Sequence, residues 1–174
     1  MKTDKNTLYY AMAIGLFIGL KYLYTLADND ALLFLLKPTN ALVAAITNST
    51  AVYSSDAGFF HQKLDIVINK SCSGFNYWIL GFIMSIFMAL QYPTARGHKI
   101  SLFPVTLALA YLLTLFVNTS RILVATYFLP GLSARYAWIH QAQGVFIYLS
   151  FLILFYLIFN HSLTTLFRKN EKFA

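Results

Sequence analysis

Charged residues are scarce in this sequence. They make up 11% of its 174 residues, and only six of them are acidic, whereas soluble globular domains carry about a quarter. The apolar share is 59% and the aromatic share is 17%. This composition excludes an ordinary soluble domain and indicates an integral membrane protein. The length leaves no room for a separate soluble domain, so we expect residues 1–174 to form a single integral membrane domain.

Cysteine is nearly absent as well. The single cysteine, Cys72, excludes an intramolecular disulfide and a cysteine-rich metal site, and we expect neither a metal nor another cofactor. The net charge is +7, but Lys and Arg stand in short clusters at the ends of apolar segments, where they set membrane orientation. We therefore expect no nucleic-acid partner.

Long apolar runs take the place of the missing charges. Four segments have the length of a spanning helix: residues 8–27, 73–92, 100–119 and 140–160. About twenty residues at 1.5 Å each cross a hydrocarbon core of about 30 Å. The first of these segments lacks a convincing cleavage site, so we interpret it as an anchor.

The segment 31–47 is apolar at both ends but has Lys37 and Pro38 near its middle. A spanning helix here would place a charge and a helix breaker at mid-membrane. We therefore expect a re-entrant or interfacial segment. Together these patterns predict an all-α polytopic membrane protein with about four to six transmembrane helices.

The basic residues predict the orientation of the spans. With four spans, the N-terminus, the middle loop and the C-terminus share one side of the membrane. The basic residues on that side are Lys2, Lys5, Arg96, Lys99, Arg168, Lys169 and Lys172. Cytoplasmic loops are enriched in Lys and Arg, so we expect this side to be the cytoplasm.

Residues 50–70 face the outside in this topology and predict a small extracytoplasmic β-hairpin. Ala51–Tyr53 and Leu64–Ile68 are typical of short strands, and turn-forming residues at 54–58 separate them. The hairpin would lie directly before the second span.

Three residues that can jointly perform acyl transfer to a thiol reach the outer rim of the bundle in this topology. Cys72 begins the second span, Arg121 follows the end of the third, and His140 begins the fourth. A thiol, a guanidinium and an imidazole can supply a nucleophile, a charge stabiliser and a proton carrier. We therefore interpret these three residues as candidate catalytic residues.

Cys72 has polar neighbours at the start of a predicted helix. Free backbone N–H groups and the positive end of the helix dipole favour a thiolate over a thiol at such a position. The alternative is that Cys72 is a small packing residue.

Arg121 is the one charge in an apolar stretch that runs from residue 100 to residue 129. Such an arginine needs a partner or a water-filled cavity. Asn118 lies three residues earlier on the same helical face, so we expect it to support the same site. The alternative is a side chain that extends to the membrane interface.

Four histidines compete for the role of base. His98 and His161 fall on the cytoplasmic side, whereas His140 and His61 lie outside. His140 is preferred because a helix start holds a side chain more rigidly than a loop does. His61 remains a rival base, and a plain interfacial histidine remains the alternative for His140.

The order of these residues resembles a known family. Ser71-Cys72-Ser73-Gly74 opens one span, Asn118-Thr119-Ser120-Arg121 stands at the end of another, and His140 opens a later one. This motif set is similar to that of the exosortase/archaeosortase family, and the resemblance covers residues 50–145.

The resemblance implies a membrane cysteine protease and transpeptidase in a bacterial or archaeal cytoplasmic (inner) membrane, with its site facing outside. It implies Cys72 as the nucleophile, His140 as the proton-transfer partner and Arg121 as the third catalytic residue, with Asn118 in support. Its partners would be membrane lipid and exported proteins that end in a short motif, a transmembrane helix and a basic cluster. The acyl acceptor, water or an amine on a lipid or glycan, stays open.

Two other classes of function compete with this interpretation. A non-enzymatic membrane scaffold or assembly subunit would use Arg121 and His140 as interfacial anchors and Cys72 for packing. A small transporter would need polar groups at mid-membrane, and apart from the cluster at Lys37 the spans have almost none.

Overall fold

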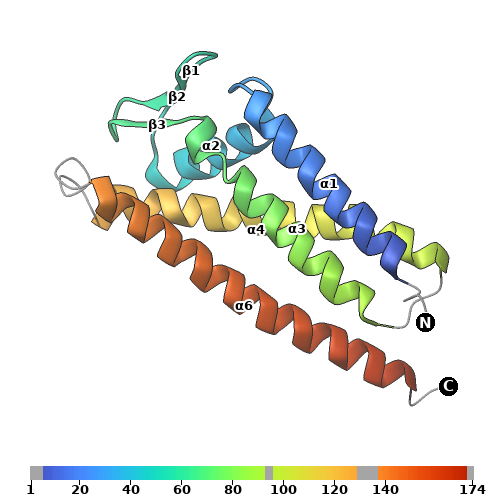
Figure 1. The fold of residues 1–174 in the computed structure, drawn as a ribbon. Coiled ribbons are helices and arrows are strands. Elements are labelled where there is room, and N and C mark those ends of the chain that lie inside the picture. Colours follow the sequence, from blue (N-terminus) through green and yellow to red (C-terminus); the bar gives the residue numbers. More distant parts are fainter. Residues whose placement is uncertain (1–5, 93–95, 129–136, 172–174) are drawn as a thin grey trace.

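The computed structural model describes residues 6–92, 96–128 and 137–171, and the side chains of 6–92, 99–127, 138 and 141–166. The long helices are α1 (Thr7–Leu26), α3 (Phe75–Leu90), α4 (Arg96–Phe128) and α6 (Ala137–Glu171). A shorter helix, α2 (Leu33–Thr47), and a small sheet lie between α1 and α3 in the sequence. Figure 1 shows the sheet and α2 at one end of the molecule, with both chain termini at the other end.

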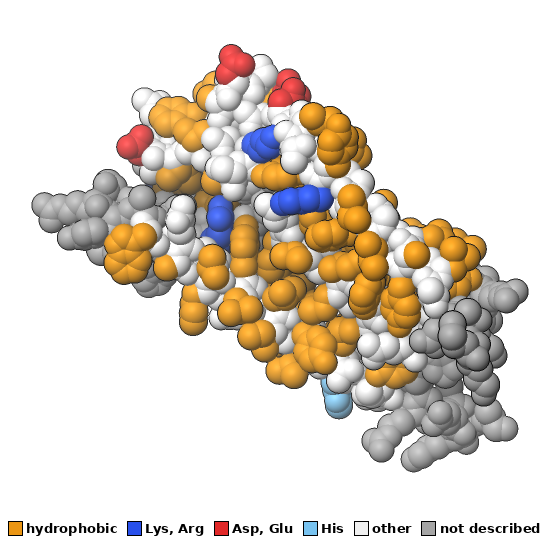
Figure 2. Space-filling view, in the orientation of Figure 1, with side chains coloured by type: hydrophobic (Ala, Val, Ile, Leu, Met, Phe, Trp, Pro, Cys, Tyr) orange, Lys and Arg blue, Asp and Glu red, His pale blue; other side chains and the backbone are white. Residues whose placement is uncertain are grey.

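Among the residues that the structure describes, four helical segments are long and apolar enough to cross a membrane: Thr7–Leu26, Lys70–Leu90, Lys99–Tyr127 and Gln141–Leu166. Apolar side chains cover the visible face of the helices, whereas the acidic side chains in view lie at the end that carries the sheet (Figure 2). This distribution suits a hydrocarbon surround with a polar cap. The predicted fold class, an all-α polytopic membrane protein, is confirmed.

Helix α3 is the central element of the bundle, with buried residues along its whole length. It packs against α1, α4 and α6. At Gly81 a Cβ atom would lie 3.4 Å from Ala110 Cβ, so two small residues let α3 and α4 approach closely. At the end that bears the termini, Asn6 donates a hydrogen bond to the Leu90 carbonyl (2.6 Å) and accepts one from Lys99 (2.5 Å).

Helix α2 is too short to span. Its 15 residues at 1.5 Å each reach about 22 Å, less than the hydrocarbon core of about 30 Å. Pro38 lies inside the helix and has no N–H to offer the carbonyl of Phe34, four residues earlier. The Tyr111 hydroxyl on α4 donates to that carbonyl instead, at 2.6 Å. The placement of residues 31–47 as re-entrant or interfacial stays a prediction.

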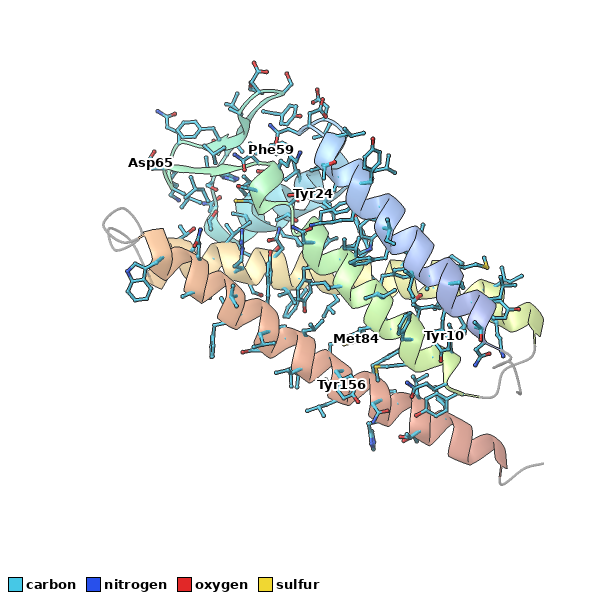
Figure 3. All side chains as sticks on the ribbon, in the orientation of Figure 1. Tyr10, Tyr24, Phe59, Asp65, Met84 and Tyr156 are labelled. Atoms are coloured by element: carbon cyan, nitrogen blue, oxygen red, sulfur yellow. The ribbon has the colours of Figure 1, made fainter. Side chains whose placement is uncertain are left out.

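The small sheet has three strands: β1 (Val52–Ser54), β2 (Gly58–His61) and β3 (Ile66–Ile68), antiparallel in the order β1-β2-β3. The predicted hairpin therefore gains a strand. The sequence of β2, Gly-Phe-Phe-His, does not alternate apolar and polar residues, so its pattern does not predict a strand. Figure 3 shows Phe59 on this sheet and Tyr24 of α1 at the same end, with Tyr10 at the opposite end.

The third predicted span needs a correction. We expected it to end near residue 119, with Arg121 beyond it, but α4 continues to Phe128. Apolar residues follow Arg121 directly, so nothing ends the helix there. Arg121 therefore projects from within a helix.

The bond between Tyr111 and Phe34 can be tested by mutation. We expect Tyr111→Phe to destabilise the protein by about 0.5–2 kcal/mol, because it leaves a carbonyl unpaired in an apolar setting. Thermal unfolding of the purified protein in detergent measures the loss. Pro38→Ala restores an N–H to α2, so the same substitution should cost less in that background. Equal losses in both backgrounds would contradict this account.

Candidate active site

Cys72 ends a short 3-10 turn, η1 (Lys70–Cys72), that joins the sheet to α3. The Cys72 N–H donates to the Asn69 carbonyl at 2.8 Å, and the Asn69 side chain accepts bonds from the Ser71 N–H (3.1 Å) and hydroxyl (2.7 Å). The helix itself begins at Phe75. The thiol therefore lies just before the N-terminus of a spanning helix, close to the place that the sequence predicts.

A buried asparagine that the sequence analysis missed fixes the start of this turn. Asn29, in the loop between α1 and α2, accepts a hydrogen bond from the Lys70 N–H at 2.8 Å. Its amide group donates to the Ser55 carbonyl at 2.8 Å. One side chain thus joins the loop, the first turn of the sheet and the cysteine turn.

Gly74 lets the cysteine turn lie directly against α4. Its φ of +71° is in the left-handed region, and a Cβ there would meet Thr114 Cγ2 at 3.0 Å and Asn118 Cγ at 3.1 Å. A residue with a side chain would need to adopt a strained conformation and displace α4. The glycine therefore sets the distance between Cys72 and α4.

Asn118 holds the turn from the other side. Its Nδ2 donates to the Cys72 carbonyl at 2.6 Å, and its Oδ1 accepts a bond from the Tyr148 hydroxyl of α6 at 2.8 Å. The side chain is fully buried. Asn118 therefore connects η1, α4 and α6, which is a structural basis for its predicted supporting role.

The guanidinium of Arg121 lies over the ring of Tyr148, with 5.2 Å between Cζ and the ring centroid. Its Nε is buried without a hydrogen-bond partner. Across the described residues, no carboxylate pairs with this guanidinium. Gly144 of α6 leaves room for it, because a Cβ there would lie 3.4 Å from Arg121 Cδ. The charge is held in place but is not neutralised.

Cys72 and Arg121 line the same cavity, which has a volume of about 220 Å³. Strand β3 forms one wall, and Ile122, Ala125 and Thr126 of α4 form the other. The sulfur of Cys72 lies 3.8 Å from the Ser71 hydroxyl and 3.9 Å from the Val67 carbonyl oxygen. The cavity thus combines a thiol, an unneutralised cation and otherwise apolar walls.

The comparison with known families bears on this arrangement. Residues 6–157 match the family described as Transmembrane exosortase (Exosortase_EpsH). The chain belongs to the transmembrane exosortase family. Membership of this exosortase family supports a membrane peptidase or transpeptidase kind of function. Among curated proteins and solved structures, no match to this exosortase was found.

The structure separates the two candidate bases of this exosortase. His140 lies in the first turn of α6, but its side chain falls outside the described residues, so its role stays a prediction. His61 is fully buried, and its ring nitrogens contact Ser49 Oγ at 2.8 Å and Asn40 Oδ1 at 2.7 Å. Because both nitrogens are engaged by Asn40 of α2 and by Ser49, which follows α2, His61 is suited to a structural role.

Tyr148 is the second site residue that the sequence analysis missed. It contacts Arg121 and Asn118 and stacks on Tyr77, with 4.8 Å between ring centroids. Gly144 and Tyr148 lie four and eight residues after His140. A helical projection from His140 would therefore have placed Gly144 and Tyr148 on one face, the face toward α4. Within the described part of the chain, no group of three His, Cys, Asp or Glu residues could hold a metal ion.

Substitution of Gly74 tests the close approach of the cysteine turn to α4. We expect Gly74→Ala to cost about 1–3 kcal/mol, because the backbone is strained and a clash with Thr114 follows. Thermal unfolding and the rate of maleimide labelling of Cys72 measure both effects. Gly15→Ala in α1 is the control, since a Cβ there meets no atom within 4 Å. Equal behaviour of the two variants would refute the proposed contact.

The buried histidine predicts a pH dependence. Burial lowers the pKa of His61 below its ordinary value of 6.5, so the unfolded chain binds the proton more readily than the folded protein does. The stability is therefore fully present above pH 6.5 and is lost as the pH falls below that value. As the pH is lowered from about 8 to about 5, the unfolding temperature of the wild type should fall more steeply than that of His61→Gln. Parallel profiles would show that His61 is not the cause.

Proposed function

We propose that this exosortase cleaves exported proteins that carry a C-terminal sorting signal, and transfers them, through a thioester on Cys72. The observation that carries the proposal is the shared cavity, which is lined by both Cys72 and Arg121, whose Nε is buried without a hydrogen-bond partner. The cavity lining includes Arg121, Ile122, Ala125 and Thr126 of α4, and α4 ends at the same end of the bundle at which α6 begins (Figure 1).

The proposed reaction begins with attack of the Cys72 sulfur on the scissile carbonyl carbon. His140 takes the thiol proton as the carbon–sulfur bond forms, and later delivers it to the leaving amine as the carbon–nitrogen bond breaks. The product is a thioester, and water or an amine then releases the acyl group and regenerates the thiol. No oxidant or metal is required for this sequence.

Arg121 is suited to stabilise the negative charge of this reaction, on the thiolate or on the tetrahedral oxyanion. Its Nε is buried without an acceptor among the described residues, and the side chain lies over the Tyr148 ring and against Gly144. A preorganised donor in a cavity with apolar walls stabilises a developing charge more than it would in water. An internal carboxylate would have cancelled this effect.

The membrane setting supports the proposed substrates. A protein anchored by its own C-terminal helix diffuses in the same plane as the enzyme, which fixes the depth of its scissile bond relative to Cys72. A basic cluster after that helix would lie on the same side as the basic termini of the enzyme, on the cytoplasmic side of the predicted topology. Depth and orientation thus select substrates before any side-chain contact.

Arg121→Ala tests the proposed reaction. The probe is a secreted reporter that ends in the C-terminal segment of an exported protein from the same genome, with a short motif, a helix and a basic cluster. We expect processing to fall by about 10²–10³, the usual effect of losing an oxyanion donor, and to be abolished in Cys72→Ala. Processing is followed by the mass of the mature reporter.

The control is Lys63→Ala, which removes a cation whose Nζ donates to the Asn48 carbonyl at 3.1 Å, outside the cavity lining. It should process the reporter as the wild type does. Labelling of Cys72 in intact cells by an impermeant maleimide reports on folding and on outward exposure. A folded Arg121→Ala with near-normal processing would make Arg121 a structural residue, and an active Cys72→Ala would favour a scaffold.

A further inference from the structure

Strand β3 is an edge strand of the sheet. It pairs with β2 through Phe59↔Ile68, Phe60↔Val67 and His61↔Ile66, and no other strand of the described chain pairs with its outer side. Unpaired edges attract further strands, and proteins usually protect them with charges or proline. The sequence of β3, Ile-Val-Ile, contains neither.

The backbone of Val67 faces outward at this edge. The loop 62–65 between β2 and β3, in which the Leu64 N–H donates to the His61 carbonyl and Asp65 has a φ of +51°, closes at the pair His61↔Ile66, and we infer that this closing pair is hydrogen-bonded. The Val67 carbonyl oxygen accepts a contact from the Cys72 thiol at 3.9 Å. In an antiparallel pair, the N–H and C=O of one residue point to the same side, and successive residues alternate. If Ile66 bonds to β2, Ile68 does so too, and the N–H and C=O of Val67 both point away from that strand.

The outward side of Val67 is also the side of the catalytic cavity. Ile66, Val67 and Ile68 form one wall of that cavity, with Cys72 and Arg121 among its other lining residues. One backbone donor and one acceptor thus face a largely apolar space, and the acceptor is contacted there by the Cys72 thiol at 3.9 Å. An extended backbone offers a matching donor and acceptor at strand spacing.

We propose that the substrate segment around the scissile bond binds as a fourth strand on the outer edge of β3, paired with the backbone of Val67. This proposal rests on the proposed function and names how that site recognises its peptide. Addition of a strand to a sheet edge gives affinity through backbone bonds and leaves specificity to alternate side chains.

The distances fit attack on a peptide bound in this way. A substrate N–H that donates to the Val67 oxygen lies about 2.9 Å from it, and the carbonyl carbon of that peptide group is only about 1.33 Å from the nitrogen. The Cys72 sulfur is itself 3.9 Å from the same oxygen. The bound peptide group and the sulfur would thus both lie within about 4 Å of the Val67 oxygen, in a cavity that Arg121 also lines.

The enzyme variant Val67→Pro removes the outward N–H and no bond to β2, and an edge strand tolerates proline at such a position. Val67→Ala shortens the side chain but keeps the N–H. We expect reporter processing by Val67→Pro to be about tenfold or more below that of Val67→Ala, the effect of one lost hydrogen bond in an apolar site. Equal processing by the two variants would overturn the proposal.

Tyr53→Pro is the matched control. Tyr53 pairs with Phe59 of β2, and the same alternation turns its N–H toward the outer edge of β1, away from the cavity. This variant also loses the hydrogen bond of Tyr53 to Asp30, so it perturbs the sheet at least as much. We expect it to process the reporter far better than Val67→Pro, and comparable losses in both would overturn the proposal.

A substrate-side experiment covers the case in which Val67→Pro does not fold. Synthetic peptides from the extramembrane part of the reporter signal, each with one N-methyl group, compete with maleimide for Cys72 of the wild-type protein. We expect protection to be lost at the one position whose N–H donates to Val67 and kept at the two positions beside it, because adjacent N–H groups of a strand face opposite sides. Uniform tolerance, or equal loss at adjacent positions, would overturn the proposal. Processing that does not need Cys72 would instead refute the proposed function.

Discussion

The hydrogen bond from Asn118 to the Cys72 carbonyl is the contact on which the site depends. The thiol belongs to a turn outside the helices, whereas the guanidinium of Arg121 belongs to α4. The bond of 2.6 Å ties the turn to the helix one turn before Arg121. The Tyr148 hydroxyl donates a hydrogen bond to the side-chain oxygen of Asn118, and the Tyr148 ring lies against the guanidinium of Arg121. A buried asparagine and a partly buried tyrosine thus hold Cys72 and Arg121 in one frame, because breaking either contact would leave a polar group without its partner.

The polar groups behind the sheet give the same rigidity to the other wall of the cavity. His61 bridges Ser49 and Asn40, and Ser49 continues to Thr47 at 2.7 Å. These bonds attach β2 to the end of α2, and β3 is attached to β2. A three-stranded sheet of this size would be marginally stable alone. Its position over the spans therefore follows from this buried network and from Asn29, which holds the first turn.

Much of the candidate site could be singled out from the sequence because its residues are exceptions to an apolar background. One cysteine at a helix start, and one arginine in a long uncharged stretch, stand out without any structure. Tyr148 and Asn29 could not be singled out in the same way. A tyrosine is common among aromatic spans, and an asparagine is common in loops, so their roles depend on tertiary contacts. The end of α4 and the strand Gly58–His61 were mispredicted for the opposite reason, because local patterns there give no signal.

The unneutralised charge of Arg121 carries a cost that the fold does not offset internally. A guanidinium near the membrane interface, with its Nε buried and unpartnered, would be stabilised by an adjacent carboxylate at little structural expense. No such carboxylate is present among the described residues, and the chain has only six acidic residues in total. An internal anion would, however, occupy the donors before a substrate arrives. The arrangement is consistent with a site in which negative charge appears only during the reaction. Arg121 would then stabilise the transition state more than the bound substrate, which lowers the activation barrier.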